Sequence, residues 1–176
     1  MEYKIYFADL THTGLEINAD RFPLGAGMVA AHASQRFQKD IEVSIFKFPE
    51  DLNEALSLQM PDVVCMSNYA WNANLSYAFA SYVKQSNPEV IIIFGGPDFP
   101  IDTPGRKEFL INRPAIDFYI KWDGEIAFTN LMDKLLPSGL DIQQFKATKT
   151  VSENTCYVYE GEYVEGPDHR AQDLTS

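Results

Sequence analysis

Apolar runs bounded by turn residues alternate along this chain with segments of helical period, and that alternation predicts parallel βαβ units. The predicted strands cover residues 3–9, 41–48, 62–67, 89–94 and 116–121. The predicted helices cover residues 23–37, 49–58 and 72–87, and a closing helix carries Phe128, Leu131, Met132 and Leu135. The pattern therefore indicates an α/β fold.

The hydrophobic pattern within each strand predicts the strand order. The third and fourth strands are continuously apolar, as in strands covered on both faces, whereas the second and fifth alternate apolar with polar residues, as at a sheet edge. Right-handed crossovers then favour the order 2-1-3-4-5, a flavodoxin-like (Rossmann-like), doubly wound sheet of five parallel strands in a three-layer α/β/α arrangement. A three-layer sheet of another order would also fit.

After Pro137 the helical and strand periods fade. Residues 155–166 are expected to form a hairpin that turns at Glu160-Gly161, and residues 167–176 have the composition of a linker. We expect one domain over residues 1–140, followed by a hairpin and linker over residues 141–176.

Charge and composition exclude several classes of function. A formal net charge of −11 repels phosphate backbones, and no run of Lys and Arg offsets it, so nucleic acid is not an expected partner. No stretch approaches the ~20 apolar residues that a membrane span needs, and the amino terminus lacks a secretion signal, so we expect a cytoplasmic protein without membrane contact. Cys65 and Cys156 lie far apart in the sequence and predict neither a disulfide framework nor a zinc site.

Ligands of open parallel sheets bind outside the carboxyl ends of the strands, where strand order reverses. The loops expected at that edge are 9–22, 67–74, 95–105 and 122–125. They are rich in amide, hydroxyl, aromatic and glycine residues, and three of them contain no basic residue. No phosphate-binding glycine motif follows a strand, and the lone Gly-x-Gly at residues 25–27 is more typical of helix packing.

Catalytic groups do not gather in the sequence. The three histidines, His12, His32 and His169, are scattered, and they suggest no Ser-His-Asp or Cys-His pair, so no catalytic or metal-binding residue is predicted. Asp9 at the end of the first strand leaves open a signalling domain of the receiver type, with Asp9 as phosphoacceptor and Lys121 as the lysine that such domains need after the fifth strand.

Gly95 and Gly96 directly follow the fourth predicted strand and have two interpretations. A tight turn that requires positive φ explains one glycine and makes no statement about a ligand. Alternatively, the pair forms a floor without side chains on which a large planar ligand can lie. Tyr69 and Trp71 in the neighbouring loop supply broad apolar area and favour the second interpretation, although a flavin between these two rings would also satisfy it.

Three segments together resemble a known family: "PDVVCMSNYAWNANLSYAFA", "IIIFGGPDFP" and "IDFYIKWDGEIAFTNLM". They are similar to the amino-terminal cobalamin-binding (vitamin B12-binding) domain of cobalamin-dependent radical S-adenosylmethionine (SAM) enzymes. The similarity covers roughly residues 3–136, and "DHRAQDL" resembles the linker into the next domain. Each motif alone is weak, but the combination is fairly specific.

The resemblance implies that the corrin ring lies on the carboxyl ends of the strands. The loop from Ser67 to Asn72 would lie under the lower face of the cobalt, Gly95-Gly96-Pro97 would flank the nucleotide tail, and Gly124-Glu125 would close its groove. The cofactor-binding residues implied in this way are Thr11, His12, Ser67, Asn68, Tyr69, Trp71, Asn72, Gly95, Gly96, Pro97, Gly124 and Glu125.

His12 departs from the pattern of related cobalamin domains. Cobalamin-dependent mutases and methionine synthase carry Asp-x-His-x2-Gly, whose histidine replaces the lower base, whereas this chain has Asp9-Leu10-Thr11-His12-Thr13-Gly14, with the histidine displaced by one position. We therefore expect no protein ligand on the lower face of the cobalt, and we expect Trp71 or a neighbour to block that face.

The chain also lacks the Cys-x3-Cys-x2-Cys run that binds the four-iron cluster of a radical SAM enzyme. It is expected either to be a fragment of a longer protein or a stand-alone carrier. In the first case the resemblance implies a downstream radical SAM domain that binds S-adenosylmethionine and a 4Fe-4S cluster, in a parent enzyme of the methyltransferase type. The residues in hand would then bind the cofactor without completing a reaction.

Overall fold

The computed structural model describes residues 2–11 and 23–169. The strands are β1 (Tyr3–Ala8), β2 (Ile41–Phe46), β3 (Val63–Ser67), β4 (Ile91–Gly95), β5 (Phe118–Ile120), β6 (Thr155–Tyr159) and β7 (Glu162–Glu165). The helices are α1 (Leu24–Phe37), α2 (Pro49–Leu58), α3 (Ala73–Ser86), α4 (Thr103–Ile111), α5 (Gly124–Leu135) and α6 (Ile142–Ala147). Two 3-10 turns, η1 (Gln38–Asp40) and η2 (Leu136–Ser138), complete the described elements.

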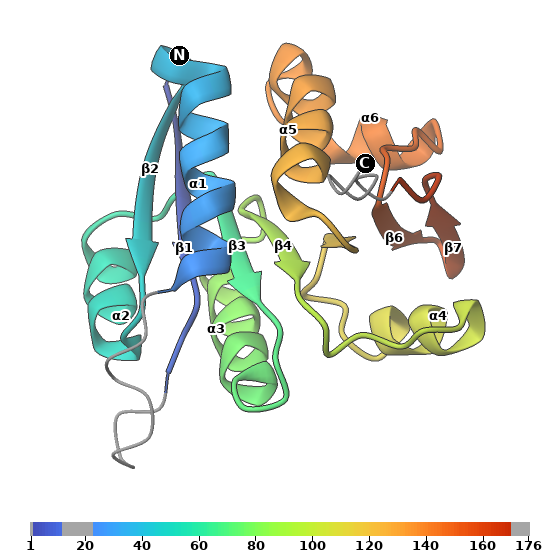
Figure 1. The fold of residues 1–176 in the computed structure, drawn as a ribbon, viewed down its shortest axis with the longest axis horizontal. Coiled ribbons are helices and arrows are strands. Elements are labelled where there is room, and N and C mark those ends of the chain that lie inside the picture. Colours follow the sequence, from blue (N-terminus) through green and yellow to red (C-terminus); the bar gives the residue numbers. More distant parts are fainter. Residues whose placement is uncertain (1, 12–22, 170–176) are drawn as a thin grey trace, which may run out of the picture.

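The described strands form one sheet of seven, in the order β2-β1-β3-β4-β5-β6-β7 (Figure 1). The first five are parallel, whereas β6 pairs antiparallel with β5 and β7 antiparallel with β6. The predicted count of five strands is therefore wrong. The hairpin predicted over 155–166 forms, and it extends the sheet beyond β5.

Strand β5 is consequently not an edge strand, and its polar residues explain the error. Asp117, just before β5, is buried and accepts hydrogen bonds from the Ile92 amide (2.9 Å) and from Lys146 Nζ (3.2 Å), and it pairs with Lys84 at 2.6 Å. Lys121, just after β5, is buried against two carboxylates. The alternation that suggests a solvent-exposed face thus arises from charges that are paired inside the protein.

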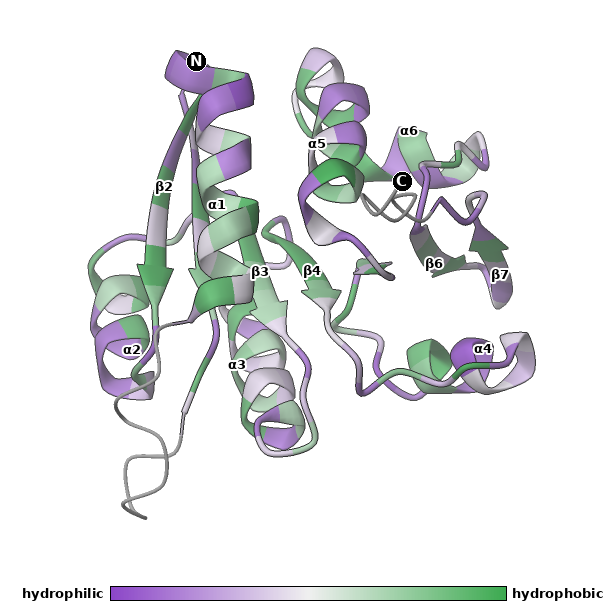
Figure 2. Ribbon diagram, in the orientation of Figure 1, coloured by the Kyte–Doolittle hydropathy of each residue, from purple (hydrophilic) through white to green (hydrophobic). Residues whose placement is uncertain are grey.

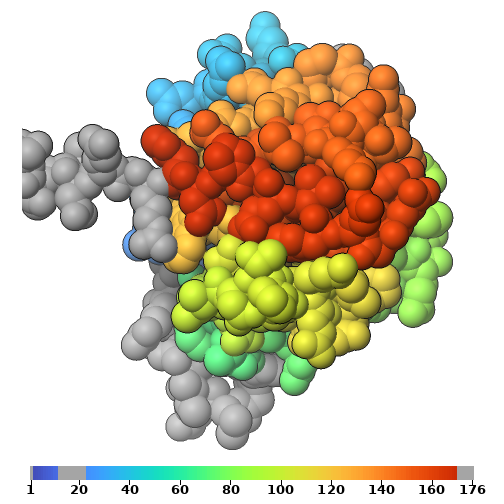
Figure 3. All heavy atoms as spheres, turned by 90° about the vertical axis from the view of Figure 1, so that its right-hand side faces the viewer, coloured from blue at the N-terminus to red at the C-terminus, as the bar shows by residue number. Residues whose placement is uncertain are grey.

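Helices cover both faces of the sheet and divide its core in two. Helices α1, α5 and α6 pack on the face that carries Ile5, Cys65 and Ile93. Helices α2, α3 and α4 pack on the opposite face. Figure 2 shows the strands β3 and β4 coloured as hydrophobic between these layers, in agreement with their complete burial on both faces. Figure 3 shows the β6–β7 hairpin lying between α5 and α6 on one side and α4 on the other.

Two short helices, α4 and α6, escape the search for apolar periodicity because each has few buried residues. Both begin with an aspartate whose side chain accepts a backbone hydrogen bond: Asp102 from the Gly105 amide at 2.8 Å, and Asp141 from the Gln144 amide at 2.9 Å. Aspartate at this position is a recognised helix-start signal. The capping residues, rather than the hydrophobic pattern, could have predicted these helices.

Candidate cofactor-binding site

A cleft of about 260 Å³ opens between α1 and α5 at the carboxyl end of the parallel strands. Its floor includes Phe7 from β1, Cys65 from β3, and Ile93 and Gly95 from β4. Its walls come from the first turns of the two helices and from the segment that joins β5 to α5. These wall residues are Gly25, Ala26, Val29, Trp122, Asp123, Gly124, Glu125 and Phe128.

The cleft exists because both helices begin with small residues. Gly25 and Ala26 open α1, and Gly124 opens α5. A Cβ at Gly124 would lie 3.0 Å from Val29 Cγ2, so glycine there also permits the close approach of the two helices. A few residues further along, the same helices bury larger side chains such as Phe37 and Leu131 and fill the space. The cavity is thus limited to the carboxyl edge.

The loop after β3 is held from below by a hydrogen-bonded cluster. Ser67 Oγ donates to Asp9 Oδ1 at 2.6 Å, and Asn72 Nδ2 donates to Ser67 Oγ at 2.8 Å and to the Leu10 carbonyl at 3.2 Å. The Tyr69 amide donates to Asn72 Oδ1 at 2.8 Å. Asp9, Ser67 and Asn72 therefore fix the shape of the loop and join it to the end of β1.

Tyr69 and Trp71 in this loop stack on each other, with ring centroids 4.4 Å apart and planes 7° apart, and Tyr69 also lines the cleft. The Trp71 side chain is 62% exposed. Partial burial, with a smaller contribution from Asp9, raises the pKa of Tyr69 above its ordinary value. Since the two rings already contact each other, they do not leave space for a flavin between them. They offer one flat aromatic surface instead.

A second cluster joins the loops that follow β3 and β4. Asn68 is buried, and its Nδ2 donates to Tyr119 Oη at 3.0 Å, while Tyr119 Oη donates to the Gly96 carbonyl at 2.8 Å. The Tyr119 ring stacks on Phe99 with centroids 3.7 Å apart. Burial raises the pKa of the Tyr119 hydroxyl well above its ordinary value, so it is a neutral donor. Tyr119 on β5 thereby sets the positions of both loops.

The geometry separates the two interpretations of Gly95-Gly96. Gly96 has φ +134°, and a Cβ there would lie 2.5 Å from the Asn68 carbonyl oxygen. The turn therefore requires glycine at position 96. Both glycines line the cleft, but Gly95 is different, because its ideal Cβ would meet the Ile120 carbonyl oxygen at an ordinary 3.5 Å. Of the two, only Gly95 lines the cleft without being required by the turn.

The receiver interpretation finds no support in the geometry. Lys121 Nζ pairs with Glu165 and Asp168, and Asp9 bonds to Ser67 and Asn72. Within residues 2–11 and 23–169, no group of three His, Cys, Asp or Glu side chains is arranged to bind a metal ion.

The other predicted site residues have different positions. The Thr11 amide donates to the Lys47 carbonyl at 3.0 Å, Glu125 lines the cleft, and Pro97 is exposed outside it. His12 lies outside the described residues. Sequence reasoning missed Gly25, Ala26, Cys65 and Trp122 as cleft residues. The Gly-x-Gly at residues 25–27 was the available signal, because it marks a helix start without bulky side chains.

Comparison with known families identifies the family of proteins to which a chain with this cleft belongs. The model of the B12-binding domain matches residues 12–132 of this chain. This chain belongs to the B12-binding domain family. The match covers the loops after β1, β3, β4 and β5 and both helices that line the cleft.

Two curated relatives of this B12-binding domain each match 73% of the chain. They are the 2-(S-pantetheinyl)-carbapenam-3-carboxylate methyltransferase of Streptantibioticus cattleyicolor, 31% identical over 134 residues, and the cobalamin-dependent radical SAM methyltransferase TokK of Streptomyces tokunonensis, 30% identical over 133 residues. The chain spans 18% of the length of each. The similarity to cobalamin-dependent radical SAM enzymes predicted from the three motifs is confirmed.

A solved structure shows the same fold. The cobalamin-dependent S-adenosylmethionine radical enzyme OxsB, with aqua-cobalamin and S-adenosylmethionine bound, has a TM-score of 0.68, at 16% identity over 96% of this chain and 22% of that chain. At this identity the likeness shows the fold alone. No helix within the described residues is both long and apolar enough to cross a membrane.

The residues of the B12-binding domain fit cobalamin. The nucleotide tail of that cofactor ends in a flat aromatic base, and the cleft offers an apolar floor of Phe7, Ile93 and Gly95 between two helix starts. Side chains larger than hydrogen at Gly25 or Gly95 would occupy part of this space. The stacked pair of Tyr69, which lines the cleft, and Trp71, which is exposed, supplies an aromatic surface at its edge.

Proposed function

We propose that this B12-binding domain holds the nucleotide tail of cobalamin in the α1–α5 cleft and the corrin ring over the loop from Ser67 to Asn72. The cleft is the observation that carries the proposal, because its bare end at Gly95 has no structural requirement for glycine, in contrast to Gly96. A partly apolar cleft at the carboxyl edge of a parallel sheet is where ligands of such folds bind.

Each predicted binding residue then has a role. Gly95 and Gly124 keep the cleft open, and Glu125 closes one end of it. Ser67, Asn68 and Asn72 act from below, because their hydrogen bonds fix the loop that faces the ligand. A lower face without a protein ligand, covered by Trp71 or a neighbour, remains part of the proposal, as do contacts of Thr11, His12 and Pro97 with the cofactor.

The parent protein is proposed to be a cobalamin-dependent radical SAM methyltransferase. The names of the two curated relatives support this interpretation. In such a protein cobalamin would relay a methyl group from S-adenosylmethionine, and a downstream domain would bind S-adenosylmethionine and a 4Fe-4S cluster. The proposal keeps a boundary near residue 140, followed by a hairpin and linker, with the strands of the hairpin joining the same sheet. It also includes a cytoplasmic location, which two buried free cysteines support.

Retention of a coloured cofactor tests the binding proposal. The chain is mixed with hydroxocobalamin, separated from free ligand by gel filtration, and examined by absorption spectroscopy. We expect the red corrin to elute with the protein, with a spectrum that lacks the imidazole-ligated form. Parallel samples receive a flavin or labelled acetyl phosphate. Loss of the corrin, together with retention of flavin or label, would contradict the proposal.

Thiol chemistry locates the bound cofactor. Cys65 lines the cleft floor, whereas Cys156 is completely buried on the opposite face of the sheet. Burial raises the pKa of both thiols, so labelling with a small methanethiosulfonate is performed at alkaline pH and mapped by mass spectrometry. We expect hydroxocobalamin to slow the labelling of Cys65, with Cys156 as the internal reference. An unchanged Cys65 rate with corrin bound would place the cofactor elsewhere.

A further inference from the structure

The residues that follow β7 turn back onto the sheet, and we name residues 166–169 the return segment. The Gly166 amide donates to the Thr155 carbonyl at 2.9 Å, and the Asn154 amide donates to the Pro167 carbonyl at 3.0 Å. Asn154 also bonds His169 twice, because its Oδ1 accepts from the His169 amide at 2.7 Å and its Nδ2 donates to the His169 carbonyl at 2.5 Å.

Close packing shows that the return segment is fitted to this position. A Cβ at Gly166 would lie 1.8 Å from the Ser152 carbonyl oxygen, so only glycine permits the crossing. Asn154 is buried and has φ +54°, a conformation that asparagine tolerates better than most residues. Both features indicate that the chain is built to hold the return segment against β5 and β6.

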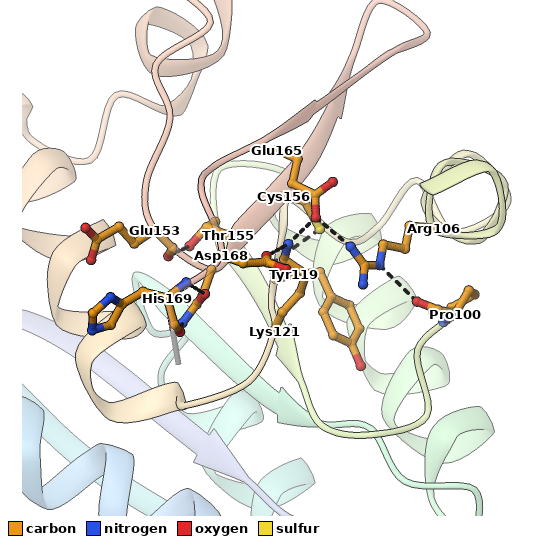
Figure 4. Close-up of polar contacts among 11 residues, drawn as sticks. Pro100, Arg106, Tyr119, Lys121, Glu153, Thr155, Cys156, Glu165, Asp168 and His169 are labelled. Carbon is orange, nitrogen blue, oxygen red and sulfur yellow. Dashed lines mark hydrogen bonds and ion pairs between the residues drawn. The ribbon is translucent and has the colours of Figure 1, made fainter. Parts of the chain in front are cut away.

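A buried lysine joins the return segment to the end of β5. Lys121 is 4% exposed, and its Nζ contacts Glu165 Oε1 and Asp168 Oδ1. Arg106 reaches the same Glu165 oxygen at 2.6 Å and donates from Nε to the Pro100 carbonyl at 3.0 Å. Figure 4 shows Lys121 between the two carboxylates, with Arg106 approaching Glu165 from α4. The positive charges of Lys121 and Arg106 are neutralised by the two carboxylates, and a buried lysine requires such paired charges.

Asp168 also reaches the cleft. Lys121, which contacts Asp168, directly precedes Trp122, and the Trp122 side chain lies beside the same carboxylate and helps to lower the pKa of Asp168. Trp122 also lines the cleft. It has φ +56°, which costs a bulky residue of order 1 kcal/mol and persists only where its surroundings hold it. The return segment supplies one such contact, at a wall of the cleft.

We propose that Asp168 is a positioning residue of the cofactor cleft, which fixes the Trp122 indole as a wall and so couples cofactor binding to docking of the return segment. The inference rests on the proposed cobalamin function. Coupling between two sites is reciprocal, so the docked return segment strengthens cofactor binding, and bound cofactor protects the return segment to the same degree. The position of residues 166–169 thereby reports whether the cleft is occupied.

The first test examines Trp122 in the absence of cofactor. The chain contains two tryptophans, so a Trp71→Phe background leaves Trp122 as the only indole emitter. We expect Asp168→Ala to shift its emission to longer wavelength and to increase acrylamide quenching. Asp168→Asn, which keeps an acceptor for the indole, should restore part of the parent signal. The control is Glu162→Ala, which removes the ion pair between Glu162 on β7 and Lys149, and neither of these residues lines the cleft.

The second test measures hydroxocobalamin affinity in a double-mutant cycle with Trp71 present. Asp168→Ala is expected to weaken binding by about fivefold to 20-fold, within the usual range of coupling between sites. In a Trp122→Phe background, which keeps a ring but no N–H, the same change should have little further effect. Hydrogen exchange of residues 166–169 should slow when the parent chain binds cobalamin. Thermal unfolding of every variant verifies that it folds.

The outcomes separate the two proposals. If the parent chain does not retain hydroxocobalamin, the proposed function fails, and the proposed coupling fails with it. The emission of Trp122 then still decides whether Asp168 positions the indole. If the parent binds, an equal loss of affinity in both backgrounds, or an unchanged emission in Asp168→Ala, overturns the inference. A loss of hydroxocobalamin affinity that occurs only in the background with Trp122, together with the emission shift, supports the inference.

Discussion

The two faces of the sheet are built in opposite ways at its carboxyl edge. On the α1–α5 face, Gly25, Ala26 and Gly95 leave a cleft. On the α3–α4 face, the same edge is filled by Tyr119 and Phe99, whose rings stack at 3.7 Å and which both contact Phe109 edge to face. One face is hollow and the other is packed, although both belong to the same strands.

The packed face makes the hollow face possible. Tyr119 and Asn68 hold the turn at Gly96 from the packed side, and the adjacent Gly95 faces the cleft without needing a side chain to fix it. Rigid support behind a bare surface is the arrangement that a pre-formed ligand site requires. The comparison predicts that changes on the packed face act mainly on stability and changes on the hollow face mainly on binding.

The largest expected effect comes from Gly96, which lines the cleft but is fixed by its contacts with Asn68 and Tyr119. A sequence-based argument for a bare floor predicts that Gly96→Val abolishes corrin retention with unfolding nearly unchanged, but the collision with Asn68 contradicts that expectation. We expect Gly96→Val to lower the free energy of unfolding by about 2 to 4 kcal/mol, because a branched side chain would be placed at positive φ against a backbone oxygen. Urea denaturation measures it.

Gly161→Val is the matched control for this change. Gly161 also has positive φ, +78°, but nothing lies within 4 Å of its ideal Cβ. The control should therefore cost only about 1 kcal/mol, from the backbone conformation alone. Equal losses in the two variants would show that contact with Asn68 does not determine the requirement for glycine.

Gly95→Val tests the hollow side and should have the next largest effect. Its side chain would enter the cleft while keeping an ordinary contact with β5, so we expect hydroxocobalamin affinity to fall about tenfold to a hundredfold, or ~1.4 to 2.8 kcal/mol. The midpoint of thermal unfolding should change little. Ile93→Val on the same floor is the control, since it costs about 0.5 to 1.5 kcal/mol of stability but widens the cleft. A greater loss of affinity in Ile93→Val than in Gly95→Val would contradict the assignment of Gly95 to the cofactor cleft.

Tyr119→Phe removes the link between the two sides. The Gly96 carbonyl would lose its donor, so we expect a cost of about 1 to 2 kcal/mol in the free energy of unfolding. Hydroxocobalamin affinity should fall as well, because the loops below the ligand lose their common anchor. Tyr157→Phe is the control, as Tyr157 Oη donates to the Thr150 carbonyl at 3.0 Å and joins no loop of the cleft. Unchanged affinity in Tyr119→Phe would separate the packed face from the site.

The smallest expected effect is the response of Trp122 emission to acidic pH. Lys121, with Trp122 and Arg106 adding to it, lowers the pKa of Asp168, whose neighbours also include Glu165. A lowered pKa in the folded state contributes stability above the ordinary value and loses it as pH falls through the folded value. Trp122 emission in the Trp71→Phe background should therefore shift as pH falls below about 4. The same shift in Asp168→Asn would assign it to another carboxylate.

Helix and strand positions were predictable where hydrophobic period alone decides them. The continuous apolar runs of β3 and β4 could only be central strands, and residues such as Leu131 and Leu135 repeat at a helical spacing that buries one face. The edge assignment of β5 failed because Asp117 and Lys121 are polar in the sequence yet buried in ion pairs whose partners, Lys146 and Glu165, come from later segments.

The sequence by itself determined the alternation of strands and helices and the family motifs at the carboxyl edge. Only the tertiary structure decided which glycine serves the turn and which serves the cleft, since Gly95 and Gly96 are identical in the sequence and differ in φ and in their distance to Asn68. It also decided that the return segment reaches the cleft wall through Asp168. Local sequence encodes period and conformational preference, whereas contacts between segments far apart in the chain arise only when the sheet assembles.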